Sequence, residues 1–516
     1  MRDLAANPVG ARAAWIAAIA VSLAVLAWPV LAGMVVTNDD LKFVRAGAVD
    51  LGIVPEIARQ WRESATFRPL EVLVGATCDP VTLAVGLTLP VQGLGLLVLA
   101  LALRSLARRV APGLPAAAPL ALLLVLLSPG TTNALWQMDA CSQTWSAALG
   151  TVALALAWRA ADAARAGTVD GRALVALGAV FLLGCCVKET FYGWSASIGT
   201  AVIVLAAVRW RRDRAAAVPT ALILIPAAVI PAAHFLLRWT TGALGGAASA
   251  GTGERYTAEL GTNVIVNAAM GVAGTVANGP FHAVMDGDAP VVVRVLPLLS
   301  VLVLGGLLIV AAGFAWMHRR DARESSMVPA AVVAAIGLGS MVVVLPMGSV
   351  SELYCFGANV GMAVLLAVAA CELWSSPAES DRAMGRSVAG ACVGIAVAVG
   401  AFGLAGRAYH HRISWACARF LNDELLRHVA AVPAVDPASG RAAAVVYLGT
   451  SCILGRTYGQ YVMPPAQALG VESTGPWLRR RDPSRPVAFT LDPPPGSRAP
   501  IDLVLDCGSL PQRAHW

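Results

Sequence analysis

The chain has 516 residues, of which 57% are hydrophobic and only 13% are charged. A soluble globular protein carries about 25% charged residues, so this composition excludes an ordinary soluble domain and indicates a membrane protein. The net charge of +7 comes from cations in short clusters between apolar runs; such clusters are typical topology signals in membrane proteins and do not indicate nucleic-acid binding.

Apolar runs of about 18 to 25 residues recur along the chain, and each is long enough to cross a hydrocarbon core about 30 Å thick. They are solid runs, unlike the alternating strands of about ten residues that build a membrane β-barrel. We therefore predict an all-α polytopic membrane protein with about eleven transmembrane helices. The expected spans lie at about residues 12–36, 83–103, 116–134, 141–157, 173–187, 194–208, 218–237, 291–316, 327–345, 355–374 and 387–406.

The first span carries Arg2 and Arg12 at its start and has no convincing cleavage site, so we interpret it as a retained anchor. Every loop inferred to lie on the side of the N-terminus holds at least two arginines. The positive-inside rule then predicts a cytoplasmic N-terminus. An odd number of spans places the C-terminal tail outside the cytoplasm.

The first outer loop, residues 37–83, follows span one and begins with the acidic pair Asp39 and Asp40. Adjacent carboxylates are costly inside lipid, so the pair belongs at the water face or in a cavity. It could take a proton from a hydroxyl, bind a divalent metal ion, or cap a following helix in a solvated turn. Arg68, near the end of the loop, could hold a phosphate bidentately at the headgroup level or snorkel to the interface.

Short polar segments follow spans three and five on the same predicted side. Trp136 and Asp139 could form a wall on which a sugar stacks, or Trp136 could belong to an interfacial aromatic belt. Lys188 is one of only two lysines in the chain and directly precedes Glu189. A compact ammonium suits a phosphate, but it could instead form an ion pair with Glu189.

Glu352 and Tyr354 lie in a short outer turn before span ten. They could orient sugar hydroxyls or hydrogen-bond the outer loops together. No cysteine and histidine cluster with metal-ligand spacing occurs in the chain, so no metal site and no other cofactor are predicted.

We predict two domains. Residues 1–406 form the transmembrane domain, which includes a second outer loop, polar and Gly-rich, at 238–290. Residues 407–516 form a small mixed α/β extracytoplasmic domain, because short strand-like runs alternate with Pro-rich turns. Cys452 and Cys507 lie in its polar part, where they could form a disulfide, which persists outside the cytoplasm, or remain two thiols.

The order of these motifs resembles the GT-C superfamily of membrane glycosyltransferases, in particular the branch of polyprenyl-phosphate-sugar-dependent O-mannosyltransferases and related bacterial enzymes. Phe67-Arg-Pro-Leu70 is similar to their Tyr-Arg-Pro-Leu turn, and Cys186-Val-Lys-Glu-Thr190 is similar to their Ser-Lys-Glu-Thr. Ser351–Ala358 is similar to their Glu-Arg-Tyr-Leu-Tyr-Leu-Pro-Ser stretch. The resemblance covers about residues 39–374 and departs from the family pattern at two positions, Leu353 in place of Arg and Ser128 in place of the His before Pro129.

The resemblance implies an inverting hexosyl or pentosyl transferase in a bacterial inner (plasma) membrane. Such an enzyme moves a sugar from a polyprenyl-phosphate donor to a glycan, lipid or protein acceptor on the extracytoplasmic face. Asp39 or Asp40 would be the base, and the donor phosphate or sugar would contact Arg68, Lys188, Glu189, Glu352 and Tyr354. The competing hypotheses are a transporter or flippase for lipids or glycolipids, and a non-catalytic assembly protein. Transporters usually show a midplane site and an internal repeat, whereas here the charges gather on one predicted face.

Overall fold

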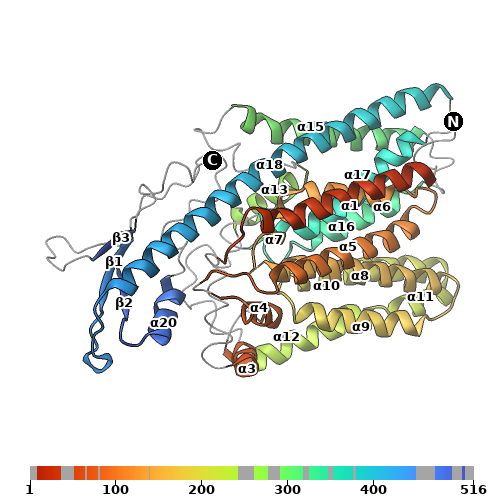
Figure 1. Ribbon diagram of the computed structural model, residues 1–516. Coiled ribbons are helices and arrows are strands. Elements are labelled where there is room, and N and C mark those ends of the chain that lie inside the picture. Colours follow the sequence, from red (N-terminus) through yellow and green to blue (C-terminus); the bar gives the residue numbers. More distant parts are fainter. Residues whose placement is uncertain are drawn as a thin grey trace.

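The computed structural model shows a helical bundle with a small sheet at one end (Figure 1). It describes residues 8–36, 52–63, 67–79, 82–138, 140–241, 261–276, 291–317, 325–346, 352–375, 379–448, 471–490 and 502–505. The α-helices are α1 (Pro8–Leu31), α3 (Ile53–Glu63), α4 (Pro69–Gly75), α5 (Thr88–Val110), α6 (Ala117–Leu127), α7 (Pro129–Leu135), α8 (Cys141–Arg165), α9 (Gly171–Cys185), α10 (Phe191–Arg212), α11 (Arg214–Ala221), α12 (Ile230–Thr240), α13 (Thr262–Val276), α15 (Val291–Met317), α16 (Met327–Gly339), α17 (Phe356–Trp374), α18 (Glu379–Ala431) and α20 (Val471–Arg481). The π-helix η2 (Ile225–Val229) joins α11 to α12, and the short 3-10 helices are η4 (Glu352–Cys355) and η5 (Pro437–Ser439).

The fold is that of a polytopic helical membrane protein, as predicted, but the expected count of eleven spans is wrong. Within the described ranges, seven helices are long and apolar enough to cross a membrane: Gly10–Leu31, Thr88–Val110, Cys141–Arg165, Phe191–Arg212, Arg214–Thr240, Phe356–Trp374 and Ala383–Tyr409. Three further apolar helices are shorter, Ala117–Leu127, Gly171–Cys185 and Met327–Gly339, and a fourth short apolar stretch, Leu298–Gly313, is part of α15. A helix of 11 residues is only about 17 Å long, so it cannot cross a hydrocarbon core by itself.

The bundle has two chemically different ends. Helices α5, α8 and α10 all finish with arginines at the end near the N-terminus, which we call the arginine end (Figure 1). The opposite end, which we call the sheet end, carries α3, α4 and the C-terminal sheet. The arginines at the ends of these three helices, which the sequence analysis assigns to inner loops, therefore share one end of the bundle.

The third predicted span is broken into α6 and α7 at Pro129, which has no N–H to continue the helix. The break leaves polar groups inside the bundle, and two later helices satisfy them. Arg407 of α18 donates from Nη2 to the carbonyl of Leu127 at 3.0 Å, and Asn359 of α17 donates to Oγ of Ser128 at 3.0 Å. The polar groups at this break are therefore hydrogen-bonded by residues more than 200 positions later in the chain.

Helices α16 and α17 cross at two glycines. A Cβ atom added to Gly361 would lie 3.0 Å from Cα of Gly337 and 3.0 Å from the carbonyl oxygen of Val333. Small residues at such a crossing let two membrane helices approach closely. The crossing also positions η4 and Tyr354, because α17 begins directly after η4.

We expect Gly361→Ala to lower the free energy of unfolding by about 1–3 kcal/mol, because the added methyl meets backbone atoms that cannot rotate away. The matched control is Gly199→Ala in α10, where an added Cβ meets nothing within 4 Å. That variant should be neutral or stabilised by up to about 1 kcal/mol, since alanine favours helix. Thermal unfolding of the purified protein in detergent measures both, and equal melting temperatures for the two variants would contradict the close crossing.

Helix α13 lies within the second outer loop predicted at 238–290. The side-chain amides of Asn263 and Asn267 donate to the carbonyls of Pro346 and Leu345, each at 3.0 Å. These bonds fix α13 beside the chain that leads into η4.

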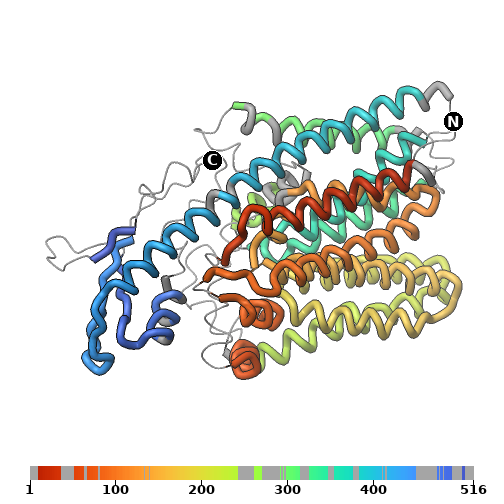
Figure 2. Tube along the Cα trace, in the orientation of Figure 1, coloured from red at the N-terminus to blue at the C-terminus, as the bar shows by residue number. Residues whose placement is uncertain are grey.

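The C-terminal region begins inside a continuous helix. Helix α18 has 53 residues and runs from the bundle to the sheet without a break at the predicted boundary of residues 406 and 407 (Figures 1 and 2). At 1.5 Å per residue it is about 80 Å long, far more than one membrane crossing needs. The helix thus links the membrane bundle to the C-terminal unit.

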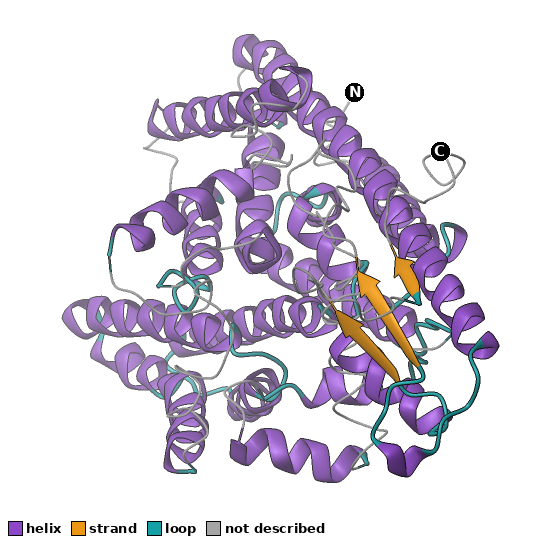
Figure 3. Cartoon of the chain, turned by 90° about the vertical axis from the view of Figure 1, so that its left-hand side faces the viewer, coloured by secondary structure: helices purple, strands orange, loops and turns teal. Residues whose placement is uncertain are grey.

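A small α/β unit follows α18, as the strand-like runs predict. Its strands are β1 (Ala444–Leu448), β2 (Val487–Thr490) and β3 (Leu503–Leu505), all parallel in the order β2-β1-β3 (Figure 3). In the central strand, Val446 aligns with Phe489 on one side and with Leu503 on the other. Parallel neighbours need a crossover connection, and α20 lies in the connection from β1 to β2 and packs on β2. Cys452 and Cys507 lie outside the described residues, so their pairing stays a prediction.

Candidate functional site

Four charged side chains from two distant segments meet at the sheet end of the bundle. Arg68 and Glu71 come from the start of α4, and Lys188 and Glu189 come from the turn between α9 and α10. Arg68 donates from Nε to Oε2 of Glu189 at 3.1 Å, and its Nη1 lies 3.4 Å from Oε2 of Glu71. Nζ of Lys188 lies 4.0 Å from Oε1 of Glu71. The cluster therefore contains two cations and two anions.

Local sequence explains how α4 contributes to this cluster. Pro69 begins the helix, where its missing N–H costs nothing. Arg68 stands just before it, and its backbone N–H donates to Oε1 of Gln60 in α3 at 3.1 Å. Glu71 falls in the first turn, where a carboxylate interacts favourably with the positive end of the helix.

Glu189 ties the two segments together through both of its oxygens. Oε1 accepts the backbone N–H of Phe67 at 3.1 Å, and Oε2 accepts Nε of Arg68. Lys188 precedes it and lies over the ring of Tyr354, with Nζ 5.9 Å from the ring centroid. The turn after α9 therefore connects α4 to η4.

The cluster is largely withdrawn from solvent. Glu71 is fully buried and Lys188 is 2% exposed, so each needs the charge of the other. Burial by itself would lower the pKa of the Arg68 guanidinium, but Glu189 and Glu71 outweigh it and raise that pKa well above its ordinary value. Burial opposes ionisation of Glu189 in the same way, and the charges of Arg68 and Lys188 overcome it and lower the pKa of that carboxyl.

The lowered pKa of Glu189 predicts how stability depends on pH. A carboxyl with a lower pKa in the folded state adds stability that is present above the ordinary glutamate pKa of about 4.3 and is lost as pH falls through the folded pKa. We expect the wild type to melt above Glu189→Gln at pH 7, and the difference to shrink as pH falls below about 4.3. Melting curves of both proteins between pH 7 and pH 3.5 test this; a difference that stays constant or grows on acidification would contradict it.

Polar residues at the start of α8 line the same cluster. Oγ of Ser142 donates to Oε1 of Glu71. Oγ of Ser146 lies 3.2 Å from Oγ1 of Thr190, which also donates to Oε1 of Gln143 at 3.4 Å. One face of the first turns of α8 is therefore polar and faces the two charged segments.

Aromatic rings close the side of the cluster next to α12. The rings of Trp61 and Phe67 meet edge to face at 5.0 Å between centroids, and Trp61 also meets the ring of His234 at 5.3 Å. The hydroxyl of Tyr192 lies 2.6 Å from Nδ1 of His234. Arg238, which is also buried, lies over the ring of Phe67 at 5.6 Å. These contacts fix the position of Phe67, directly before Arg68.

The structure brings together four of the predicted site residues: Arg68, Lys188, Glu189 and Tyr354. It also shows a pairing that the sequence did not suggest: among the described ion pairs, Lys188 lies within reach of Glu71, whereas Glu189 binds Arg68. Glu352 lies in η4, and its side chain is outside the described set. Asp39, Asp40 and Asp139 also lie outside the described residues.

Trp136 has a different role from the two considered for it. Its side chain is 1% exposed, its indole N–H donates to the carbonyl of Val25 in α1 at 2.9 Å, and its ring meets that of His411 in α18 edge to face. A sugar-stacking wall and an interfacial belt both need an accessible ring face, so both expectations are wrong for Trp136. The residue is an internal contact between α1, α7 and α18.

Sequence reasoning missed Glu71 and Ser142. A signal for Glu71 was present, because it is the only charged residue between Arg68 and Asp79 and stands three positions after Arg68, the spacing of neighbours on a helix surface. Ser142, Gln143 and Ser146 likewise place polar groups in the first turns of a predicted span. These polar groups meet Glu71 only because α4 packs against α8.

The chain that leads to the acidic pair is fixed next to this cluster. The backbone N–H of Val36 donates to the carbonyl of Leu83 at 3.0 Å, and its buried side chain packs with Val74 of α4 and Cys141 of α8. Val74 is one turn from Glu71, and Cys141 is next to Ser142. The described chain therefore ends, three residues before Asp39, beside the elements that carry the charged cluster.

Comparison with known protein families and curated proteins found no match for the chain. No protein-family model matches the chain, and no curated protein matches it. Among the residues with a described position, no group of three or more His, Cys, Asp or Glu side chains could hold a metal ion; Asp39 and Asp40 are not part of that set.

Arg68 keeps hydrogen-bond donors beyond those used in its two ion pairs. The two ion pairs of Arg68 use its Nε and Nη1 atoms, and a guanidinium has further N–H donors on Nη2. The Arg68 side chain keeps 16% of its surface exposed, so it is the more accessible of the two cluster cations. Glu71 and Glu189 hold the guanidinium in one orientation before any ligand arrives.

Proposed function

We propose that the protein is an integral membrane glycosyltransferase of the GT-C type. It transfers a hexose or pentose from a polyprenyl-phosphate donor to a glycan, lipid or protein acceptor, with inversion at the anomeric carbon. The observation that carries this proposal is the meeting of the Arg-Pro-Leu and Lys-Glu motifs, more than 100 residues apart, in one charged cluster at one end of the bundle.

The chemistry needs a base and a place for a departing phosphate. The acceptor oxygen attacks the anomeric carbon, its proton passes to a carboxylate, and the bond to the phosphate oxygen breaks with its electrons leaving on the polyprenyl phosphate. In this proposal Asp39 or Asp40 takes the proton. Arg68, supported by Lys188 and Tyr354, stabilises the negative charge on the leaving group.

The length of the chain is compatible with a base at Asp39 or Asp40 and a phosphate site at Arg68. Asp39 comes three residues after Val36 and Asp40 four, so the chain can carry them at most about 11 Å and about 14 Å from Val36 and the elements around it. Those elements are α4 and the start of α8, which hold Glu71 and Ser142.

The distribution of arginines supports an orientation. By the positive-inside rule the arginine end faces the cytoplasm, and the N-terminus with it. The charged cluster, the first outer loop and the C-terminal α/β unit then belong to the extracytoplasmic face of a bacterial inner (plasma) membrane. A lipid-linked sugar presented on that face would reach the cluster.

A transporter or flippase is the competing function, and one experiment separates the two. The purified protein is reconstituted into liposomes with polyprenyl-phosphate sugars labelled in the sugar, together with extracts of cell-envelope acceptors. A glycosyltransferase releases free polyprenyl phosphate and moves the label to an acceptor. A flippase moves the intact labelled lipid across the bilayer without breaking the sugar–phosphate bond, and that result would overturn the proposal.

A further inference from the structure

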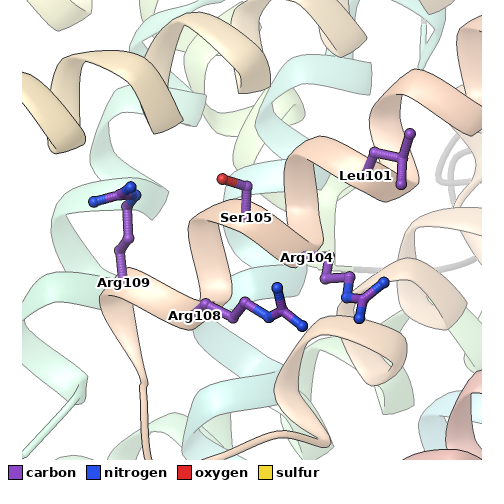
Figure 4. A pocket seen from close by; sticks show the side chains of 5 residues that line it. All are labelled: Leu101, Arg104, Ser105, Arg108 and Arg109. Carbon is purple, nitrogen blue, oxygen red and sulfur yellow. The ribbon is translucent and has the colours of Figure 1, made fainter. Parts of the chain in front are cut away.

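A pocket at the arginine end of the bundle lies far from the charged cluster. It has a volume of about 550 Å³ and is lined by Leu101, Arg104, Ser105, Arg108 and Arg109 in the last turns of α5 (Figure 4). Helix α5 begins at Thr88, near the cluster, and Arg108 is 20 residues further on. At 1.5 Å per residue this is about 30 Å, the thickness of a hydrocarbon core.

An apolar stripe on α5 leads to this pocket. Leu94, Leu97 and Leu101 are 52%, 55% and 56% exposed. About half of the surface of each leucine is therefore not covered by the described part of the chain. With 100° per residue, these leucines and the two arginines Arg104 and Arg108 fall within an arc of about 80° on one face of the helix. The face is therefore apolar along most of a membrane leaflet and cationic at its end.

The arginines differ in what they contact. Nη1 of Arg109 lies 3.2 Å from Oδ2 of Asp162 in α8, so that side chain has an acidic partner. In Figure 4, Arg104 and Arg108 extend to a different side of α5 from Arg109. With 100° per residue, Arg104 and Arg108 fall on the same face of the helix as the leucine stripe. Both belong to the exposed residues of the chain.

We propose that this face binds an anionic phospholipid, with the phosphate between Arg104 and Arg108 and an acyl chain along the leucine stripe. Charge complementarity selects the headgroup, because guanidinium groups match phosphate oxygens in bidentate geometry. The leucines select a lipid over a soluble phosphate, because they supply the surface on which an acyl chain packs. The site is independent of the proposed transfer reaction and lies at the other end of the bundle.

Native mass spectrometry of the detergent-purified full chain, titrated with dioleoyl phosphatidylglycerol, tests the site. Each cation near an anionic lipid contributes about 1 kcal/mol, so Arg104→Ala combined with Arg108→Ala is expected to weaken lipid retention about 30-fold. The matched control combines Arg211→Ala with Arg212→Ala, two exposed arginines at the end of α10 at the same end of the bundle. The control should stay within about threefold of wild type, and both variants should keep the wild-type melting temperature because the residues are exposed.

Four results would overturn the proposal. Equal weakening by the two double variants would show that any pair of arginines at this end attracts the lipid. Equal retention of dioleoyl phosphatidylcholine would remove the selection for charge. Displacement of the lipid by inorganic phosphate at millimolar concentration, or equal binding of dihexanoyl phosphatidylglycerol, would show an anion site without a role for the leucine stripe.

Discussion

Replacing Glu71 by leucine is expected to lower the free energy of unfolding by about 3–5 kcal/mol, the usual effect of removing one partner from a buried ion pair. Glu71 is fully buried, and Lys188 beside it is 2% exposed. The substitution leaves the ammonium of Lys188 withdrawn from water and without the carboxylate that lies 4.0 Å from it. Arg68 loses one of its two acidic partners at the same time but keeps Glu189.

A second substitution should reverse much of this loss. Combining Glu71→Leu with Lys188→Met removes both buried charges, and buried pairs replaced by apolar side chains are often neutral in stability. We expect the double variant to be more stable than Glu71→Leu alone by at least about 2 kcal/mol, since coupled residues deviate from additivity by about 0.5–3 kcal/mol. Thermal and denaturant unfolding in detergent measure the four proteins of the cycle.

The matched control for this cycle is an exposed pair of the same type. Glu424 and Arg427 of α18 form an ion pair in which the arginine side chain is 69% exposed. Glu424→Leu should change stability by no more than about 1 kcal/mol, because exposed pairs contribute little. If Glu71→Leu were as mild as Glu424→Leu, or if the double variant were only the sum of its parts, the buried pair would not stabilise the site.

Asn in place of Asp39 or Asp40 is expected to reduce sugar transfer by about 10²–10⁴-fold, the usual contribution of a general base. The change removes the negative charge and keeps the size of the side chain, so the melting temperature should not move. Transfer of labelled sugar from the polyprenyl-phosphate donor gives the rate. The larger loss identifies which of the two aspartates takes the proton.

Asp162→Asn is the control for this pair. Asp162 is 54% exposed at the arginine end, where it contacts Arg109, and the proposed reaction does not use it. Its substitution should leave transfer within about twofold of wild type, since exposed ion pairs contribute little. Transfer that survives in both Asp39→Asn and Asp40→Asn would move the base to another residue, and Glu189 would be the next carboxylate to test.

Four residues that were expected on one side of the membrane lie together at the sheet end of the bundle. Arg68, Lys188, Glu189 and Tyr354 all fall in loops that the predicted order of spans places on the same side of the membrane. Topology cannot decide which acid meets which base. Glu71 binds Lys188 because α4 packs across the start of α8, and Glu189 binds Arg68 across 121 residues of sequence.

Other expectations failed because they assumed that each segment acts alone. Trp136 follows an apolar run as an interfacial tryptophan would, but α1 and α18 cover it. The break of the third span at Pro129 was visible in the sequence. The residues that hydrogen-bond its polar groups, Asn359 and Arg407, belong to later helices. Short apolar helices count as spans in a hydropathy profile, although several are too short to cross a bilayer by themselves.

The amino-acid sequence by itself determined that this is a polytopic helical membrane protein with a small C-terminal α/β unit and arginines gathered at one end. Each of these properties depends on residues that are close in sequence, because every apolar run must form its own backbone hydrogen bonds in lipid. Only the tertiary structure decided which buried charges pair, which tryptophan is covered and how far α18 extends. The first two outcomes depend on packing between segments more than a hundred residues apart, and the spacing of residues in the sequence carries no information about which distant segments meet.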